Sequence, residues 1–327
     1  ATGHWAQPRF HNFIDDTWIE GKPSATLQIP EGQYDPALGL SYLQVARRGW
    51  GEQKSQNGGF GIPPAGPAFN GYHLYASRVA TTATEPNFFH GIDVSLMGIA
   101  DYAPASQQGW IRDRLASINT LVEQAMHNFS VEAPDTIAPD LAQGLQQTQA
   151  LIQEIQHKPL PADARYNMLH ELNTKRLQFN TALAQALGLS VEAVVSNDAD
   201  PSEIGRFGGS SDTFQAAIPG QTFGVQVHVA NQGKDPVAIQ DVRLLTTPDK
   251  DWTLRMNGPA PAALTGNEAE NIDFGVTVPA DATITRPYFS RPNLEQPYYN
   301  LLNPAYANLS TMPYPLSAQV TFGYRGA

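Results

Sequence analysis

Three apolar stripes at helical spacing run through residues 107–187. Within each stripe, the positions recur at alternating steps of four and three residues, which places them on one face of a helix. Prolines precede the second and third stripes, and Gly188 follows the third, where a left-handed cap is usual. The pattern predicts an antiparallel three-helix bundle. The stripe positions are Ile111, Leu115, Ile118, Val122, Ala125 and Phe129, then Leu141, Leu145, Thr148, Ile152 and Ile155, then Leu169, Leu172, Arg176, Phe179 and Leu183.

Beyond Gly188 the apolar positions recur at every second residue, which is the period of a half-buried strand. Several such runs with turns between them predict an antiparallel β-sandwich of immunoglobulin-like build. The alternating positions are Val191, Ala193 and Val195, then Phe223, Val225, Val227 and Val229, then Val237, Ile239, Val242 and Leu244, then Ile272, Phe274, Val276 and Val278, and finally Leu316, Ala318, Val320 and Phe322.

The segment before the bundle is irregular, aromatic and rich in Gly and Pro. Asp35 and Pro36 predict the start of a short helix that runs to about Trp50, and residues 72–79 alternate weakly as a strand does. We therefore expect an α+β multidomain protein, mainly helical in its N-terminal part. Its predicted parts are 1–105, which packs on the bundle, 106–188, the bundle, and 189–327, the sandwich.

Composition narrows the classes of partner. The chain has 20 basic and 31 acidic residues, a formal net charge of −11, and its basic residues form no cluster that would bind nucleic acid or an anionic membrane. Its apolar runs are far shorter than the roughly 20 residues of a membrane span, so we expect none. It has no cysteine, which excludes disulfides and thiolate metal sites.

Low Lys with abundant Gln, Asn, Thr, Pro and Gly is typical of exported bacterial proteins. The sequence starts at Ala1 without a charged and apolar leader. We expect a secreted, periplasmic or cell-surface protein from which a signal peptide or an upstream region has been removed.

A long loop punctuated by Gly and Pro covers residues 49–67. Loops of this length are often functional, so its polar centre is a candidate for substrate binding. The candidate residues are Gln53, Lys54, Ser55 and Gln56.

An insertion rich in Arg, Pro and Tyr covers residues 285–299, between the last predicted strands. Tyr and Arg are frequent in recognition surfaces, and Arg286 and Tyr288 are the candidates here. A proline-pinned loop that covers a sheet edge would have a similar composition.

Asp198, Asp200 and Glu203 form an acidic loop after the predicted strand at 191–195. Carboxylate oxygens are calcium ligands, although a solvated turn at a domain boundary is the simpler interpretation. The histidines are scattered, and the sequence contains no zinc-binding motif, nucleophile elbow or phosphate-binding loop. We assign no catalytic residue and no cofactor to this chain.

Five segments in order carry a resemblance to one family: residues 18–21, 29–42, 54–56, 89–100 and 276–289. They look like consecutive pieces of large exported bacterial proteins of the PIG-L/LmbE de-N-acetylase family. The zinc site of that family belongs to an N-terminal Rossmann-like domain, and its Pro-His-Pro-Asp-Asp-Glu-like motif is absent here. The chain resembles the region that follows this domain.

The resemblance implies an accessory, substrate-recognition region of a zinc-dependent N-deacetylase, with zinc on a separate catalytic domain or chain. The loop at residues 53–56 would contact a sugar or another amide substrate. At the position where the resemblance leads us to expect His, directly before the triplet 54–56, this chain has Gln53.

A second interpretation remains open. In it, the chain is a stand-alone extracellular protein without catalysis, which is structural, self-assembling or carbohydrate-binding. The expected partners are accordingly a PIG-L/LmbE-like catalytic chain, a second copy of this chain, or a glycan.

Overall fold

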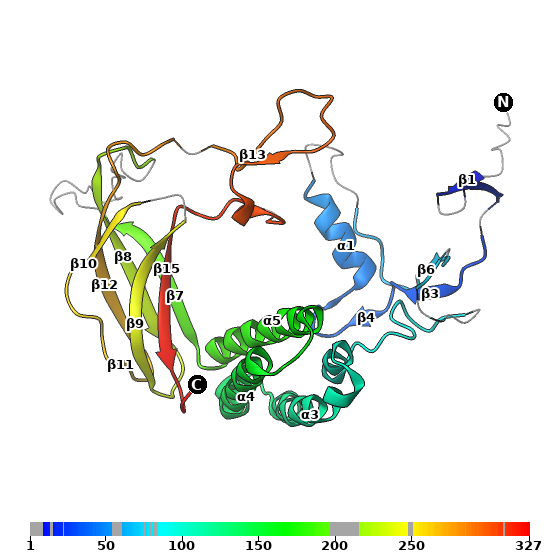
Figure 1. Ribbon diagram of the computed structural model, residues 1–327, viewed down its shortest axis with the longest axis horizontal. Helices are drawn as coiled ribbons and strands as arrows, with labels where there is room; N and C mark the ends of the chain where they lie inside the picture. The colour runs from blue at the N-terminus through cyan, green and yellow to red at the C-terminus, as the bar shows by residue number, and fades with distance from the viewer. Residues whose placement is uncertain are drawn as a thin grey trace. The chain divides into compact units, whose positions relative to one another are not determined.

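The computed structural model of the chain describes residues 9–13, 16–21, 23–53, 61–74, 76–78, 80, 84–196, 216–247, 251–284, 286–309 and 311–327. It is a mixed structure of helices and antiparallel sheets (Figure 1), as the sequence predicts. The chain divides into two compact units, Ala1–Gly98 and Ile99–Ala327. The finer division at 105 and 188 stays a prediction.

The first unit consists of short two-stranded antiparallel sheets and one helix. Of the described residues in 72–79, where a strand was predicted, only Tyr72 belongs to a strand, as the last residue of β6, which pairs antiparallel with β3. The large aromatic side chains Phe13 and Trp18 are 86% and 58% exposed. The elements are β1 (Arg9–Asn12) with β2 (Thr17–Glu20), β3 (Leu27–Pro30) with β6 (Phe69–Tyr72), β4 (Tyr34–Asp35) with β5 (Leu40–Ser41), and α1 (Tyr42–Gly51).

Helix α1 ends near Trp50 as predicted, but the predicted start at Asp35 is wrong. The Asp35 carboxylate accepts hydrogen bonds from two backbone N–H groups of the β4–β5 turn and from the Tyr42 hydroxyl. These hydrogen bonds lower the pKa of Asp35, and the one from the Tyr42 hydroxyl has the largest effect. The helix is capped instead by Ser41, whose Oγ accepts from the Gln44 backbone while the Gln44 side chain accepts from the Ser41 backbone.

Three long helices open the second unit. Helix α4 packs against both α3 and α5, and the predicted stripe of α4 is entirely buried. The short helix η1 (Leu96–Tyr102) precedes them. The bounds are α3 (Ala105–Asn128), η2 (Pro134–Ile137), α4 (Ala138–His157) and α5 (Ala162–Ala186).

Two of the predicted stripes drift by one residue. In α3, Leu121 is buried rather than Val122, and Phe129 is 54% exposed because the helix ends at Asn128. In α5, Met168 is buried where Leu169 was expected. Arg176, also predicted for the α5 stripe, is exposed. Steps of four and three average 3.5 residues per turn, whereas a helix has 3.6, so a fixed alternation of steps misplaces single positions of the buried face.

Helices α4 and α5 approach closely at Gly144. A Cβ added there would lie 2.3 Å from Cε1 of the buried Phe179 ring. Thr148, on the next turn, is fully buried, and its hydroxyl donates to the Gly144 carbonyl at 2.8 Å. Only glycine fits between this ring and the α4 backbone.

The second unit continues with two antiparallel sheets. Their orders are β10-β12-β8-β7 and β11-β9-β15, and residues of both sheets line one crevice, so the sheets face one another (Figure 1). The bounds are β7 (Leu189–Ser196), β8 (Thr222–Asn231), β9 (Val237–Thr246), β10 (Thr253–Met256), β11 (Ala263–Leu264), β12 (Glu268–Thr277) and β15 (Leu316–Gly323).

The predicted inward positions of β8, β9 and β12 are confirmed as buried, and those of β15 are half-buried. Strand β7 differs, because Val191 is 46% exposed and Ala193 is exposed as well. Among the described strands, β7 pairs only with β8. As an edge strand it is covered on fewer sides than the central strands.

The helices and the sheets meet at the end of α5. Gly188 has φ +68°, which confirms the predicted left-handed cap, and it lies against Gly233 in the turn after β8. Lys234 Nζ forms an ion pair with Asp135 Oδ2 of η2 at 2.6 Å, and this hydrogen-bonded contact raises the pKa of the lysine. On the other sheet, the Gln146 amide of α4 donates to the Arg325 carbonyl at 2.9 Å.

Replacing Gly144 with Ala is expected to lower the free energy of unfolding by roughly 1–3 kcal/mol, because the methyl group overpacks against Phe179. The measurement is urea denaturation followed by circular dichroism. Gly109→Ala is the matched control: it lies on α3 with nothing within 4 Å of the added Cβ, and should be neutral or stabilising by up to about 1 kcal/mol. Adding Phe179→Leu to Gly144→Ala should recover part of the loss, and a loss without such recovery contradicts the close-packing explanation.

Tyr324 is expected to ionise late in an alkaline titration. The pKa of Tyr324 is raised from 10.0 to about 12. Burial is the larger cause, and the hydrogen bond of 2.7 Å that the hydroxyl donates to Asp235 is the second. Its neutral form is favoured in the folded state, so this stabilisation is complete below pH 10 and is lost between about pH 10 and 12. The phenolate absorbance of the parent chain minus that of Tyr324→Phe should show a single titration step near pH 12. A step near pH 10 in this difference would exclude the buried, bonded phenol.

Candidate functional site

The segment between β12 and β15 contains the predicted Arg-, Pro- and Tyr-rich insertion. Strands β13 (Phe289–Ser290) and β14 (Asn300–Leu301) pair and project a loop, and η4 (Pro304–Tyr306) follows (Figure 1). Asn303 starts η4 by accepting a hydrogen bond from Ala305 N at 2.9 Å. The segment is therefore an ordered structure with its own hydrogen bonds.

Tyr288 holds the base of this segment together. Its hydroxyl donates to the Leu309 carbonyl at 2.7 Å, and its carbonyl accepts from Leu302 N at 2.9 Å. Its ring meets those of Phe289 and Tyr306 edge to face, at centroid distances of 5.2 and 6.1 Å. These contacts fix the Tyr288 side chain in one position.

A pocket of about 490 Å³ opens beside Tyr288, within the range of small-molecule sites. Its lining combines aromatic rings, prolines and aliphatic side chains with a few polar groups. Tyr306 is 6% exposed and forms a buried wall. The described residues that line it are Thr247, Thr283, Ile284, Arg286, Tyr288, Leu302, Asn303, Pro304, Tyr306, Met312, Pro313 and Pro315.

Arg286 is the one charged side chain among the described residues that line this pocket. The structure gives it no hydrogen bond or ion pair within the described part of the chain, although the chain as a whole carries a formal charge of −11. The pocket therefore presents an uncompensated cation next to tyrosine rings.

The structure brings together two of the residues proposed from the sequence, Arg286 and Tyr288. Gln53 is exposed, and its N–H donates to the Trp50 carbonyl at 3.1 Å directly after α1, in the first unit. The other candidates, Lys54, Ser55, Gln56, Asp198, Asp200 and Glu203, lie outside the described residues. Sequence reasoning missed Tyr306 and Asn303, for which the Asn-Pro helix start at 303 was a usable signal.

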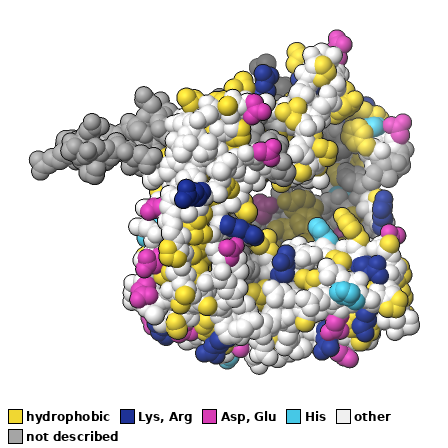
Figure 2. All heavy atoms as spheres, turned by 60° about the vertical axis from the view of Figure 1, so that its left-hand side comes forward, with side chains coloured by type: hydrophobic (Ala, Val, Ile, Leu, Met, Phe, Trp, Pro, Cys, Tyr) yellow, Lys and Arg dark blue, Asp and Glu magenta, His cyan; other side chains and the backbone are white. Residues whose placement is uncertain are grey.

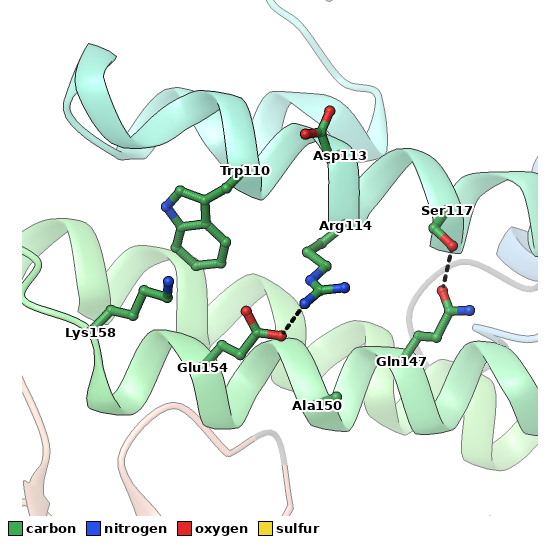
Figure 3. A pocket seen from close by; sticks show the side chains of 8 residues that line it. All are labelled: Trp110, Asp113, Arg114, Ser117, Gln147, Ala150, Glu154 and Lys158. Atoms are coloured by element: carbon green, nitrogen blue, oxygen red, sulfur yellow. Dashed lines mark hydrogen bonds and ion pairs between the residues drawn. The ribbon is translucent and has the colours of Figure 1, made fainter.

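A second hollow, of about 460 Å³, lies between α3 and α4 (Figure 3). Arg114 and Glu154 form an ion pair across it at 3.0 Å, and Ser117 bonds Gln147 at 2.9 Å. At one end the Lys158 ammonium lies 4.5 Å from the centre of the Trp110 ring. The Arg114–Glu154 and Ser117–Gln147 pairs join α3 to α4, so this groove is better described as a polar contact between two helices than as a ligand site.

A third hollow, of about 260 Å³, lies between the two sheets and is mostly apolar. It is lined by β7, β8, the end of β9 and the start of β15, together with Trp252 and Tyr314. The Trp252 indole N–H is buried and has no hydrogen-bond partner in the described structure. None of the described residues that line this crevice is charged, in contrast to the Arg286 pocket.

The surface charges are mixed. On the face drawn in Figure 2, Lys and Arg side chains are interspersed with Asp and Glu, and no continuous basic patch forms there. Within the described ranges, no three His, Asp or Glu side chains are grouped so as to hold a metal ion. No helix in those ranges has both the length and the apolar character needed to cross a membrane.

Comparison with models of known families finds no match to this chain, and no curated protein matches it. The interpretation of the Arg286 pocket therefore depends on its own geometry and chemistry.

Replacing Tyr288 with Phe is expected to lower the free energy of unfolding by roughly 0.5–1.5 kcal/mol, because the Leu309 carbonyl loses its donor. Urea denaturation measures the change. Tyr298→Phe removes a hydroxyl from a side chain that is 62% exposed in the projecting loop and should change stability by less than about 0.5 kcal/mol. Equal effects of the two substitutions would contradict the anchoring role of Tyr288.

Proposed function

We propose that this chain is the accessory, substrate-recognition region of a PIG-L/LmbE-like zinc-dependent N-deacetylase whose catalytic domain lies outside it. The resemblance of five ordered segments supports the family, and the pocket beside Tyr288 supports the role in recognition. As the resemblance implies, the protein is exported and acts outside the cytoplasm.

The observation that carries the recognition role is the composition of the Arg286 pocket. It joins two tyrosines with the amide of Asn303 and the hydroxyls of Thr247 and Thr283. A sugar ring has an apolar C–H face and an edge of hydroxyl groups, so it requires aromatic surface and hydrogen-bonding groups together. A sugar is therefore the class of ligand that fits this lining best.

We also infer a finer description of the fold. The packing of α4 against α3 and α5 supports an antiparallel three-helix bundle. The strand order β7-β8-β12-β10 corresponds to strands A, B, E and D of an immunoglobulin-like sandwich, and β9 and β15 correspond to C and F. In this scheme the Arg286 pocket belongs to the connection between strands E and F.

In the proposed complex, zinc is bound by the catalytic domain and supplies a bound water for attack on an N-acetyl carbonyl. This chain contributes binding and orientation of the sugar, which favour the reaction by reducing its entropic cost. Gln53, Lys54, Ser55 and Gln56 remain proposed as further polar contacts to the substrate, and Asp198, Asp200 and Glu203 as a calcium site.

The alternative is a stand-alone extracellular protein that assembles with itself or binds carbohydrate without catalysis. The loop between β13 and β14 favours it, because Leu294, Tyr298 and Tyr299 are 85%, 62% and 55% exposed. Exposed aromatic and apolar side chains grouped on one projection mark an interaction surface.

Native mass spectrometry and zinc analysis of the protein purified from its own source distinguish these functions. The deacetylase proposal expects this chain joined to, or associated with, a polypeptide that carries the zinc motif, with about one zinc per copy. An assembly of copies of this chain alone, without zinc, would refute the proposal and favour the alternative.

A further inference from the structure

We infer that the Arg286 pocket selects sugars that carry a carboxylate. This inference depends on the proposed role of the pocket in sugar recognition, and it narrows the class of ligand from sugars in general to acidic sugars.

The charge of the pocket is the first argument. Among the described residues that line it, Arg286 carries the one charged side chain. A guanidinium without an acidic neighbour in the protein favours an anionic group on the ligand, and its planar fork matches the two oxygens of a carboxylate. A neutral sugar would leave this cation without a counter-charge.

The groove between α3 and α4 has a different distribution of charge within the same unit. Its lining includes two basic residues, Arg114 and Lys158, and two acidic residues, Asp113 and Glu154, and Arg114 is already paired with Glu154 (Figure 3). A ligand anion that binds Arg114 would have to displace the Glu154 carboxylate. In the Arg286 pocket no such competition occurs among the described residues.

The polar groups around Arg286 suit the rest of a sugar. Asn303 uses its Oδ1 to cap η4, and its side-chain amide has no acceptor among the described residues, which leaves two N–H donors. Tyr288 and Tyr306 offer ring surface. Arg286, Asn303 and the tyrosines thus provide separate partners for a carboxylate, for hydroxyls and for the C–H face.

A single guanidinium also favours a carboxylate over a phosphate. Phosphate sites usually gather several cations or the N–H groups of a helix N-terminus around a group that carries up to two charges. This pocket has one cation, and that cation is exposed. We therefore commit to a monoanionic carboxylate as the group that Arg286 binds.

The test compares matched sugars by isothermal titration calorimetry on the full chain at low salt. The probes are N-acetylmuramic acid with N-acetylglucosamine, and glucuronic acid with glucose; the acid of each pair adds a carboxylate. We expect at least one acid to bind roughly 10- to 100-fold more tightly than its neutral partner, because one charge-assisted hydrogen-bonded contact is formed. The preference should shrink as salt is added, because the guanidinium is exposed.

Arg286→Gln should abolish the preference for the acid while neutral-sugar binding is retained, and Arg286→Lys should keep part of it because the charge remains. Arg255→Gln is the matched control, since Arg255 is an exposed arginine on β10 outside the pocket lining. It removes the same net charge, so it should leave the preference unchanged.

The outcomes separate the two claims. Equal binding of acids and neutral sugars, lost in Tyr288→Ala, would overturn the carboxylate inference and leave sugar recognition intact. Absence of binding by all four probes would overturn both. A preference for the acid that survives in Arg286→Gln would place the carboxylate elsewhere and overturn the inference as well.

Discussion

The second unit depends on a close backbone contact between the end of α5 and the turn after β8. A Cβ added to Gly233 would lie 2.3 Å from the Leu187 carbonyl oxygen, and one added to Gly188 would lie 2.7 Å from Gly233 N. No side chain larger than hydrogen fits in this contact. It fixes the point at which the sheets leave the helices, and the ion pair between Lys234 and Asp135 is formed beside it.

The candidate pocket lies at the far end of the same sheets. Strand β9 starts at Val237, near the junction, and ends at Thr246, next to the pocket residue Thr247. Strand β15 returns from Leu316 to Gly323 in register with β9. Two paired strands thus connect the junction to the candidate site, and binding loops are commonly carried by a stable scaffold in this way.

Periodicity predicted the parts of this fold in which packing is regular. The stripe of α4 and the alternation of β8, β9 and β12 were correct because a single buried face determines each pattern. The start of α1 was wrong, because Asp35 has two possible uses for its carboxylate, a helix cap or a turn, and the chain uses the turn. Burial of Val191 was wrong because the sequence does not state which strand lies at an edge.

The candidate site, too, could be predicted from the sequence only in part. Composition singled out Arg286 and Tyr288, but it did not indicate Tyr306 and Asn303, which reach the pocket through η4 after the projecting loop. The difference between Arg286 and the paired Arg114 is also not a property of sequence. Arg114 is neutralised by Glu154 across two helices, whereas Arg286 stands among tyrosines and prolines without an acid in the lining. Since an unpaired cation gains more from a ligand anion than a paired one does, the absence of a carboxylate from the described lining makes Arg286 a better candidate for anion binding than Arg114.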